Sequence, residues 1–299
     1  ITKDDIGNEV RPHCIRFAFF GTSQIAVYVL DALTAAGFTP NLVVTQTPKP
    51  KGRRLEAQPT EVEAWARKRG IAIAYDFSEF ERAAWDVAIV ADYGRILSKQ
   101  LIAIPARGFL NVHPSLLPRL RGASPIRSAI LKDERATGVS IILVNERMDE
   151  GPIVAQKKIE VESWPPRNIE LEQTLMQAGG ILLTQILPQW IAGDIDAHEQ
   201  NHDIATYSEK IKKEDGLLDL NADGYENLLK IRAYEGWPGT YTFFERAGKK
   251  IRVQILDAHL ENDPSTSLGA SKLVIDKVKP EGKREMGYEE FLRSGAQPV

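Results

Sequence analysis

The chain has 299 residues, of which 43% are hydrophobic and 26% are charged, and its formal net charge is −3. This composition is that of an ordinary globular protein long enough for two domains, and the charge gives no global reason to expect a polyanionic partner. A single cysteine, Cys14, excludes an internal disulfide framework and a cysteine-based zinc site, and no apolar run approaches the roughly 20 residues that span a bilayer.

The N-terminal two thirds of the chain alternate between buried strands and helices. Residues 1–14 are polar, and we expect them to be a loose extension or a cloning remnant without a function. Strands are predicted at 15–20, 42–44, 71–74, 86–91, 109–112, 139–144 and 153–161, and helices at 25–36, 60–68 and 169–193. This alternation predicts an α/β domain over residues 15–193: a Rossmann-like, mostly parallel sheet with helices on both faces.

The pattern changes after a polar linker at residues 194–204. A short helix is predicted at 225–231, and strands are predicted at 240–244, 251–255 and 273–275, the first two joined at Gly248. Residues 205–299 are therefore expected to form a smaller, β-rich second domain.

Two polar side chains stand two residues apart near the end of the predicted strand at 109–112. Asn111 and His113 would point to the same face, presenting an amide and an imidazole together. Such groups stabilise a developing oxyanion and move a proton in acyl transfer. Asp149, in a predicted turn after another strand, is the best candidate to orient the imidazole. Spacing alone leaves the site open, because a lone histidine at a strand end is more often structural and Asp-Glu-Gly-Pro is by default a turn.

Other loops at the carboxyl ends of the predicted strands are less specific. Gly21-Thr22-Ser23 suits a helix start that binds an anion, but it lacks the G-x-G-x-x-G pattern of a dinucleotide site. The segment 49–54 carries four cations in six residues. Such a run is usually solvated surface, although a basic loop beside a cleft could also hold a phosphate backbone. The loop 115–118 could be simple packing, and Arg119 and Arg121 could be solvated.

Taken together, these segments resemble the methionyl-tRNA formyltransferase family of folate-dependent formyltransferases over roughly residues 15–299. The resemblance is carried by FFGTSQIAVYVLDAL, TQTPKPKGRRLEAQP, ADYGRIL, GFLNVHPSLLPRLRGASPI, TGVSIILVNERMDEGPI, ATYSEKIKKEDG, IRAYEGWPGTYT and KPEGKREMGYEEFLRSG. The Asn-x-His-x-Ser-Leu-Leu-Pro motif with the later aspartate is specific to folate-dependent formyltransferases as a group. The basic loop and the C-terminal segments narrow the resemblance to the tRNA enzymes.

The resemblance implies a donor, 10-formyltetrahydrofolate, and an acceptor, the α-amino group of methionine on initiator tRNA. It implies that Asn111, His113 and Asp149 are catalytic and that no metal takes part. It further implies an OB-like β-barrel as the C-terminal domain, a monomer in the cytoplasm and no membrane association. Contacts with folate are implied for Tyr93, Gly94, Ile96, Ser115, Leu116, Leu117 and Pro118, and contacts with tRNA for Lys49, Lys51, Arg53 and Arg54.

The main alternative is a folate-dependent formyltransferase that acts on an amino sugar nucleotide, which would share the catalytic residues but would not need the basic loop. Three features depart from the tRNA family: Gly-Thr-Ser lacks the proline that commonly follows the threonine, the basic loop is slightly short, and residues 205–299 hold 15 Lys and Arg against 16 Asp and Glu. RNA binding by the second domain would therefore need a one-sided patch, for which the candidates are Lys210, Lys212, Lys213, Lys249, Lys250 and Arg252.

Overall fold

The computed structural model describes residues 15–51, 56–262 and 271–298. Within them the chain forms two compact units, and neither is one continuous segment. The first unit contains residues 15–122, 136–160 and 172–207, and the second contains residues 123–135, 161–171 and 208–298. Two short segments from the middle of the sequence thus group with the C-terminal part of the chain.

The first unit is built on a seven-stranded sheet whose order is β10-β9-β7-β6-β1-β2-β5. The strands β1, β2, β5, β6 and β7 pair in parallel, whereas β9 runs antiparallel to both β7 and β10. The bounds are β1 Phe17–Gly21, β2 Leu42–Val44, β5 Ala72–Ala74, β6 Val87–Ala91, β7 Phe109–His113, β9 Thr137–Leu143 and β10 Ile153–Ile159.

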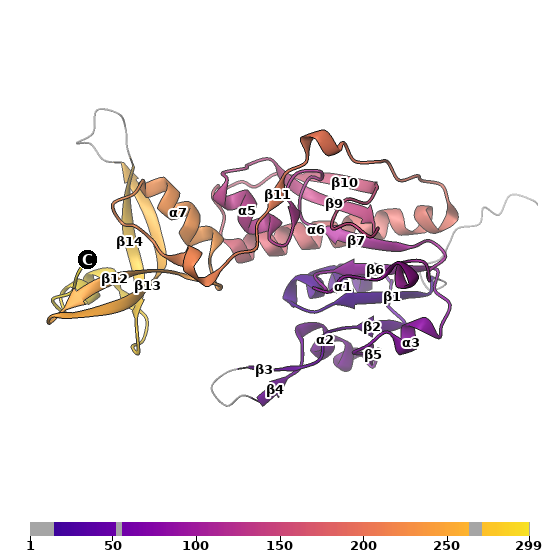
Figure 1. The fold of residues 1–299 in the computed structure, drawn as a ribbon, viewed down its shortest axis with the longest axis horizontal. Coiled ribbons are helices and arrows are strands. Elements are labelled where there is room, and N and C mark those ends of the chain that lie inside the picture. The colour runs from indigo at the N-terminus through magenta and orange to yellow at the C-terminus, as the bar shows by residue number, and fades with distance from the viewer. Residues whose placement is uncertain (1–14, 52–55, 263–270, 299) are drawn as a thin grey trace, which may run out of the picture. The chain divides into compact units, whose positions relative to one another are not determined.

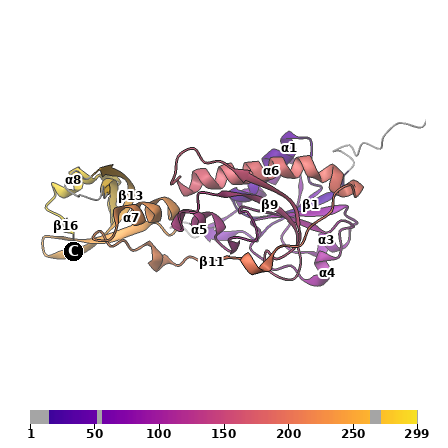
Figure 2. The same cartoon turned by 90° about the horizontal axis from the view of Figure 1, so that it is seen from above.

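Helices cover both faces of this sheet, which is why β1 is buried along its whole length. Helices α1 and α6 lie on one face, and α3 and α4 lie on the other (Figure 2). Gly180 permits the close contact between α6 and α1, because a Cβ atom there would lie 2.6 Å from the Ala32 Cβ atom. The helices of this unit are α1 Gln24–Ala35, α2 Glu61–Arg69, α3 Ser78–Glu81, α4 Lys99–Ile102 and most of α6 Asn168–Ala192.

Local sequence fixes where the first two helices begin and where the second ends. Ser23 accepts a hydrogen bond from the backbone N–H of Ile25, and Thr60 accepts one from that of Glu63, so each caps the helix that follows. Gly70 ends α2 in the left-handed conformation, where glycine is not penalised. The helix α1 therefore starts directly after β1, at the carboxyl edge of the sheet (Figure 1).

The second unit contains a five-stranded antiparallel sheet with the order β15-β14-β13-β12-β16. Side chains alternate along β12: Thr240, Thr242 and Phe244 are buried, and Tyr241 and Phe243 are half-buried. The apolar core lies on the Phe244 side of the sheet and includes Ile231 of α7 and Phe291 of α8. The bounds are β12 Thr240–Arg246, β13 Lys249–Asn262, β14 Ser271–Pro280, β15 Met286–Gly287, β16 Gln297–Pro298, α5 Pro125–Leu131, α7 Gly224–Ala233 and α8 Tyr288–Leu292.

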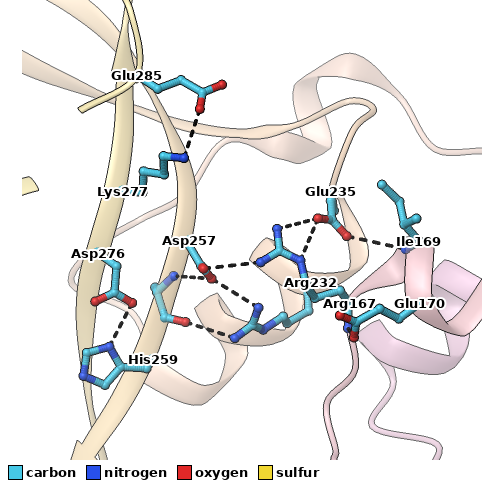
Figure 3. A network of polar contacts seen from close by, with 11 residues as sticks. Arg167, Ile169, Glu170, Arg232, Glu235, Asp257, His259, Asp276, Lys277 and Glu285 are labelled. Carbon is cyan, nitrogen blue, oxygen red and sulfur yellow. Dashed lines mark hydrogen bonds and ion pairs between the residues drawn. The ribbon is translucent and has the colours of Figure 1, made fainter. Parts of the chain in front are cut away.

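Ion pairs tie the segment 161–171 to the rest of this unit (Figure 3). The guanidinium group of Arg167 donates to Glu235, just after α7, and at 3.3 Å to Asp257 of β13. Asp257 also accepts a hydrogen bond of 3.1 Å from Arg232 of α7. The hydrogen bonds to Glu235 raise the pKa of Arg167, which therefore stays charged. The segment 161–171 is thus held within the second unit by side chains more than 60 residues later.

The predicted fold class is confirmed: a mostly parallel α/β sheet precedes an antiparallel β-rich part. The short elements α3, α4, α5 and α8, and the two-residue strands β8 Arg121–Gly122 and β11 Tyr207–Ser208, have no counterpart in the sequence prediction. They are too short to produce a recognisable hydrophobic period. The two-stranded β3 Lys49–Lys51 and β4 Glu56–Gln58 flank the basic loop. No helix within the described residues is both long and apolar enough to cross a membrane.

Candidate active site

The strand β7 places Asn111 and His113 on one face at the carboxyl edge of the first sheet. His113 is the last residue of the strand and is only 4% exposed, whereas Asn111 is half-buried. Asn111 lies beside Val90 of β6 and Ile142 of β9 in the strand register. Because residues i and i+2 of a strand share a face, both side chains reach the same neighbour.

That neighbour is Asp149, in the turn between β9 and β10. Its Oδ1 atom lies 3.4 Å from Nδ2 of Asn111 and 3.5 Å from Nδ1 of His113. Its Oδ2 atom accepts a hydrogen bond of 2.8 Å from the backbone N–H of Gly122. One oxygen is therefore fixed by the main chain, while the other is shared by two long contacts.

The turn that carries Asp149 has an uncommon backbone. Asp149 has a φ of 56°, a left-handed conformation that is uncommon for non-glycine residues and that aspartate adopts more readily than most. Gly151 is required for steric reasons, because a Cβ atom there would lie 1.7 Å from the carbonyl oxygen of Leu143. The turn is thus pressed against the end of β9.

Both ring nitrogens of His113 face oxygen atoms that can only accept. Nδ1 faces the Asp149 carboxylate, and Nε2 lies 3.1 Å from the carbonyl oxygen of Leu120. A neutral imidazole carries one N–H and would leave a lone pair against one of these oxygens. In either tautomer the ring N–H therefore has an oxygen acceptor, which holds the orientation of the imidazole.

The loop after β7 is held by hydrogen bonds to the sheet. Ser140 of β9 donates to the carbonyl oxygen of Ser115 at 2.6 Å and accepts from the N–H of Leu117 at 3.1 Å. Gln156 of β10 donates to the carbonyl oxygen of Leu117 at 2.9 Å. Ser115 and Leu117 are buried, Leu116 and Pro118 are half-buried, and the Leu117–Pro118 peptide bond is cis. The hydrogen bonds with Ser140 and Gln156 therefore define the shape of the predicted contact loop.

The loop after β6 lies at the same sheet edge, because β6 is the neighbour of β7. The backbone carbonyl of Tyr93 accepts hydrogen bonds from Thr22 at 3.2 Å and Gln46 at 2.9 Å. Burial raises the pKa of the Tyr93 phenol. Gly94 is exposed, and Ile96 is 83% exposed. The loop thus offers an open apolar side chain beside the strand ends.

The residues predicted to contact tRNA lie elsewhere. Lys49 and Lys51 belong to β3, and Arg53 and Arg54 lie outside the described residues. Among the described residues, no group of three or more His, Cys, Asp or Glu side chains could hold a metal ion.

Two family descriptions match the chain: "Formyl transferase" at residues 15–187, and "Formyl transferase, C-terminal domain" at residues 210–272. The methionyl-tRNA formyltransferase of Chloroflexus aggregans is 35% identical over 303 residues, which cover 93% of this chain and 96% of the relative. The enzyme of the same name from Thermotoga maritima is 38% identical over 245 residues, which cover 79% of this chain and 78% of the relative. The chain belongs to the methionyl-tRNA formyltransferase family.

Solved structures share the fold of this family at low sequence identity. An N-formyltransferase from Helicobacter canadensis, in complex with folinic acid and dTDP-3-aminofucose, has a TM-score of 0.65 at 16% identity and covers 87% of this chain and 98% of its own. HypX from Aquifex aeolicus, in complex with tetrahydrofolic acid, has a TM-score of 0.64 at 16% identity and covers 93% of this chain and 47% of its own. The shared architecture extends over most of this formyltransferase.

The sequence did not reveal that Arg121 is structural. This side chain is 1% exposed, so the expectation that it could be solvated is wrong. Its guanidinium group donates to Oε1 of Gln200 through Nε at 3.1 Å and Nη2 at 2.7 Å. The only hint in the sequence was its place in a Pro-bounded loop, which does not distinguish a buried arginine from an exposed one.

Proposed function

We propose that this formyltransferase transfers the formyl group of 10-formyltetrahydrofolate to the α-amino group of methionine carried by initiator tRNA. The convergence of Asn111 and His113 on Asp149 at the carboxyl edge of the sheet is the observation that carries this proposal. Membership in the methionyl-tRNA formyltransferase family supports the choice of acceptor.

The donor groups match the charge that the reaction creates. When the amine attacks the formyl carbon, a C–N bond forms and negative charge collects on the formyl oxygen. Asn111 uses one hydrogen of Nδ2 toward Asp149, and the second hydrogen of the same nitrogen can be donated to this oxygen. The imidazole of His113, on the same face of β7, is the second polar group beside this oxygen. Each donor in such a site lowers the barrier by about 3 kcal/mol.

Asp149 completes the proton balance. The attacking amine must lose a proton, and the departing N10 atom of the folate must gain one when its bond to the formyl carbon breaks. The Oδ1 atom of Asp149, which has only long contacts, is the base placed to accept and return this proton. The Oδ2 atom remains on the Gly122 N–H, so the carboxylate keeps its position during the transfer.

The two loops beside these residues fit the folate. A flat heterocyclic ring needs an apolar surface and backbone polar groups at fixed positions. The loop 115–118 and the exposed Ile96 provide the apolar surface. We expect the exposed backbone from Gly94 to Ile96 to provide the polar groups. Catalysis needs no redox step and no metal ion.

For the tRNA, we propose that the outer face of β12 and β13 contacts RNA in addition to the predicted basic loop. Phe243 pairs with Arg252 across the two strands, and the Arg252 guanidinium lies 3.7 Å from the ring centroid of Tyr241. The Lys250 ammonium lies 4.5 Å from the ring centroid of Phe243. Aromatic rings interleaved with cations suit bases and phosphates. All five lysines singled out in the sequence are exposed: Lys210, Lys212, Lys213, Lys249 and Lys250.

The same proposal places the protein in the cytoplasm, where initiator tRNA is charged, and treats it as a monomer. The monomeric state stays a prediction, which light scattering of the purified chain would test.

The test is a formyl-transfer assay with 10-formyltetrahydrofolate and either methionyl initiator tRNA or a dTDP-linked amino sugar. We expect formylated tRNA only, and a loss of about 10²–10³-fold in kcat for each of Asn111→Ala, His113→Ala and Asp149→Ala. Asn227→Ala is the matched control, because this amide is equally dependent on a hydrogen bond but lies in the second unit. Formylation of the sugar alone, or full activity of the three variants, would contradict the proposal.

A further inference from the structure

A buried polar cluster stands behind the turn that carries Asp149. Gln200, which is 4% exposed, uses its single Nε2 group to donate to the carbonyl oxygen of Asp149 at 2.8 Å and to that of Gly151 at 2.7 Å. The two carbonyls belong to the left-handed turn itself. Gln200 lies on the chain after α6, about 50 residues from the turn that it holds.

Arg121 fixes the other end of the same amide. Both Nε and Nη2 of Arg121 donate to Oε1 of Gln200, which determines which end of the amide faces the turn. The amide therefore cannot rotate by half a turn without placing its NH2 group against the guanidinium and its oxygen against two carbonyls.

Further contacts hold the guanidinium group in place. Nη2 of Arg121 lies 3.0 Å from Nδ1 of His202, and Nη1 lies 3.3 Å from the Tyr207 hydroxyl and 3.7 Å from the Glu150 carboxylate. The Arg121 backbone N–H donates to the carbonyl oxygen of Thr206 at 2.9 Å. Arg121 thus contacts four residues of the segment 200–207, and Gln200 of that segment contacts the turn directly.

The segment that carries Arg121 also contacts the carboxylate of Asp149 directly. Gly122, the residue after Arg121, donates its N–H to Oδ2 of Asp149, while Gln200 holds the Asp149 carbonyl. Gly122 therefore fixes the side chain of Asp149. Gln200, which is held by Arg121, fixes its main chain. Uncommon φ values persist only where the surrounding structure determines them in this way.

We propose that Gln200, oriented by Arg121, is a positioning residue for Asp149, and that its loss slows formyl transfer by misplacing the carboxylate rather than by weakening substrate binding. The inference rests on the proposed function, because it assigns a role to Asp149 in catalysis. Neither side chain reaches the reacting atoms; each acts through the turn.

The decisive variant is Gln200→Met, which keeps the side-chain length but removes both hydrogen bonds to the turn. Because a displacement of about 1 Å at a catalytic group can cost 10²-fold, we expect kcat to fall by about 10- to 100-fold. The KM values for 10-formyltetrahydrofolate and for the tRNA should stay within about twofold, and the pH–rate profile should change shape because the contact of Asp149 with His113 is altered.

Gln200→Glu tests the hydrogen bonds to the turn separately from those with Arg121. Glutamate still accepts from Arg121, but its carboxylate would meet the carbonyl oxygens of Asp149 and Gly151 without a proton to donate. We expect it to be at least as slow as Gln200→Met. If Gln200→Met does not fold, Gln200→Asn, which is one methylene shorter, gives the same comparison. Asn227→Leu, which removes a buried amide from the second unit, is the control and should keep kcat.

The role of Asp149 is isolated by repeating Gln200→Met in an Asp149→Asn background. If Gln200 acts through Asp149, the second substitution should lower kcat by less than about twofold in that background. Equal losses in both backgrounds, or a raised KM with an unchanged kcat, would overturn the inference. An Asp149→Asn variant with full activity would instead contradict the proposed function, so the two failures are distinguishable.

Discussion

Replacement of Gly151 by alanine should displace the turn that carries Asp149 without changing any polar group. A Cβ atom at this position would lie 1.7 Å from the Leu143 carbonyl oxygen and 2.9 Å from its carbon atom. Cβ contacts under 3.0 Å essentially do not occur, so the two segments must separate by at least 1.3 Å. Neither neighbouring atom belongs to a flexible side chain, so the main chain has to move.

The size of this displacement sets the expected effects. Overpacking typically costs about 1–3 kcal/mol of stability, and a contact with main-chain atoms belongs at the upper end. A catalytic group displaced by about 1 Å can lose 10²-fold in rate. Because Asp149 stands two residues before Gly151, we expect kcat to fall by about 100-fold while the KM for folate changes little.

The assay combines urea unfolding with steady-state formyl transfer on the same preparation. Gly287→Ala is the matched control, because nothing lies within 4 Å of its added Cβ atom and, as at Gly151, its φ is not positive. That variant should keep both the stability and the rate. A Gly151→Ala protein with native stability and a kcat within about twofold of the native value would refute the reasoning, because the turn would then tolerate displacement.

Two further predictions concern the second unit. The hydrogen bond to Asp276 raises the pKa of the exposed His259 above its usual value of about 6.5, so this contact stabilises the fold at low pH and is lost as the pH rises through the raised pKa. In thermal unfolding, His259→Gln should therefore be less stable than the native chain near pH 6 and equally stable at about pH 9. A difference in stability that does not change with pH would contradict this. Arg252→Gln should reduce the salt dependence of tRNA binding by about one phosphate contact, measured as the KM for tRNA against salt concentration. The control Arg293→Gln, at an exposed arginine, should leave this dependence unchanged. Equal changes in the two variants would exclude the β12–β13 face as an RNA contact.

Some of the architecture follows directly from local sequence. Five residues such as Phe17–Gly21, without a polar side chain, predict a strand buried on both faces. The i, i+2 spacing of Asn111 and His113 places both on one face of a strand whatever surrounds it. Ser23 and Thr60 determine helix starts through hydrogen bonds within three residues. Each of these features depends on residues that are close in the chain, so no long-range information is needed to predict it.

The site itself depends on contacts between distant segments. Asp149 is 38 residues from Asn111, and its turn after a strand made it the best candidate for the site without showing that it lies beside Asn111 and His113. The sequence showed the basic residues 49–54 and made Lys249, Lys250 and Arg252 candidates for a basic patch, but it did not show that Tyr241 and Phe243 lie beside these cations. This aromatic and cationic face of β12 and β13 exists only because the antiparallel register places Arg252 opposite Phe243.

The sequence by itself determined the alternation of the longer strands and helices and the pair of polar groups at the end of β7. Only the tertiary structure decided that Arg121 is buried, because arginine is almost always exposed unless a partner compensates its charge and hydrogen bonds. That partner, Gln200, is 79 residues away. Likewise, Arg167 joins the second unit through Glu235 and Asp257, 68 and 90 residues later. Local pattern cannot specify such pairs, since folding creates the proximity that makes them favourable.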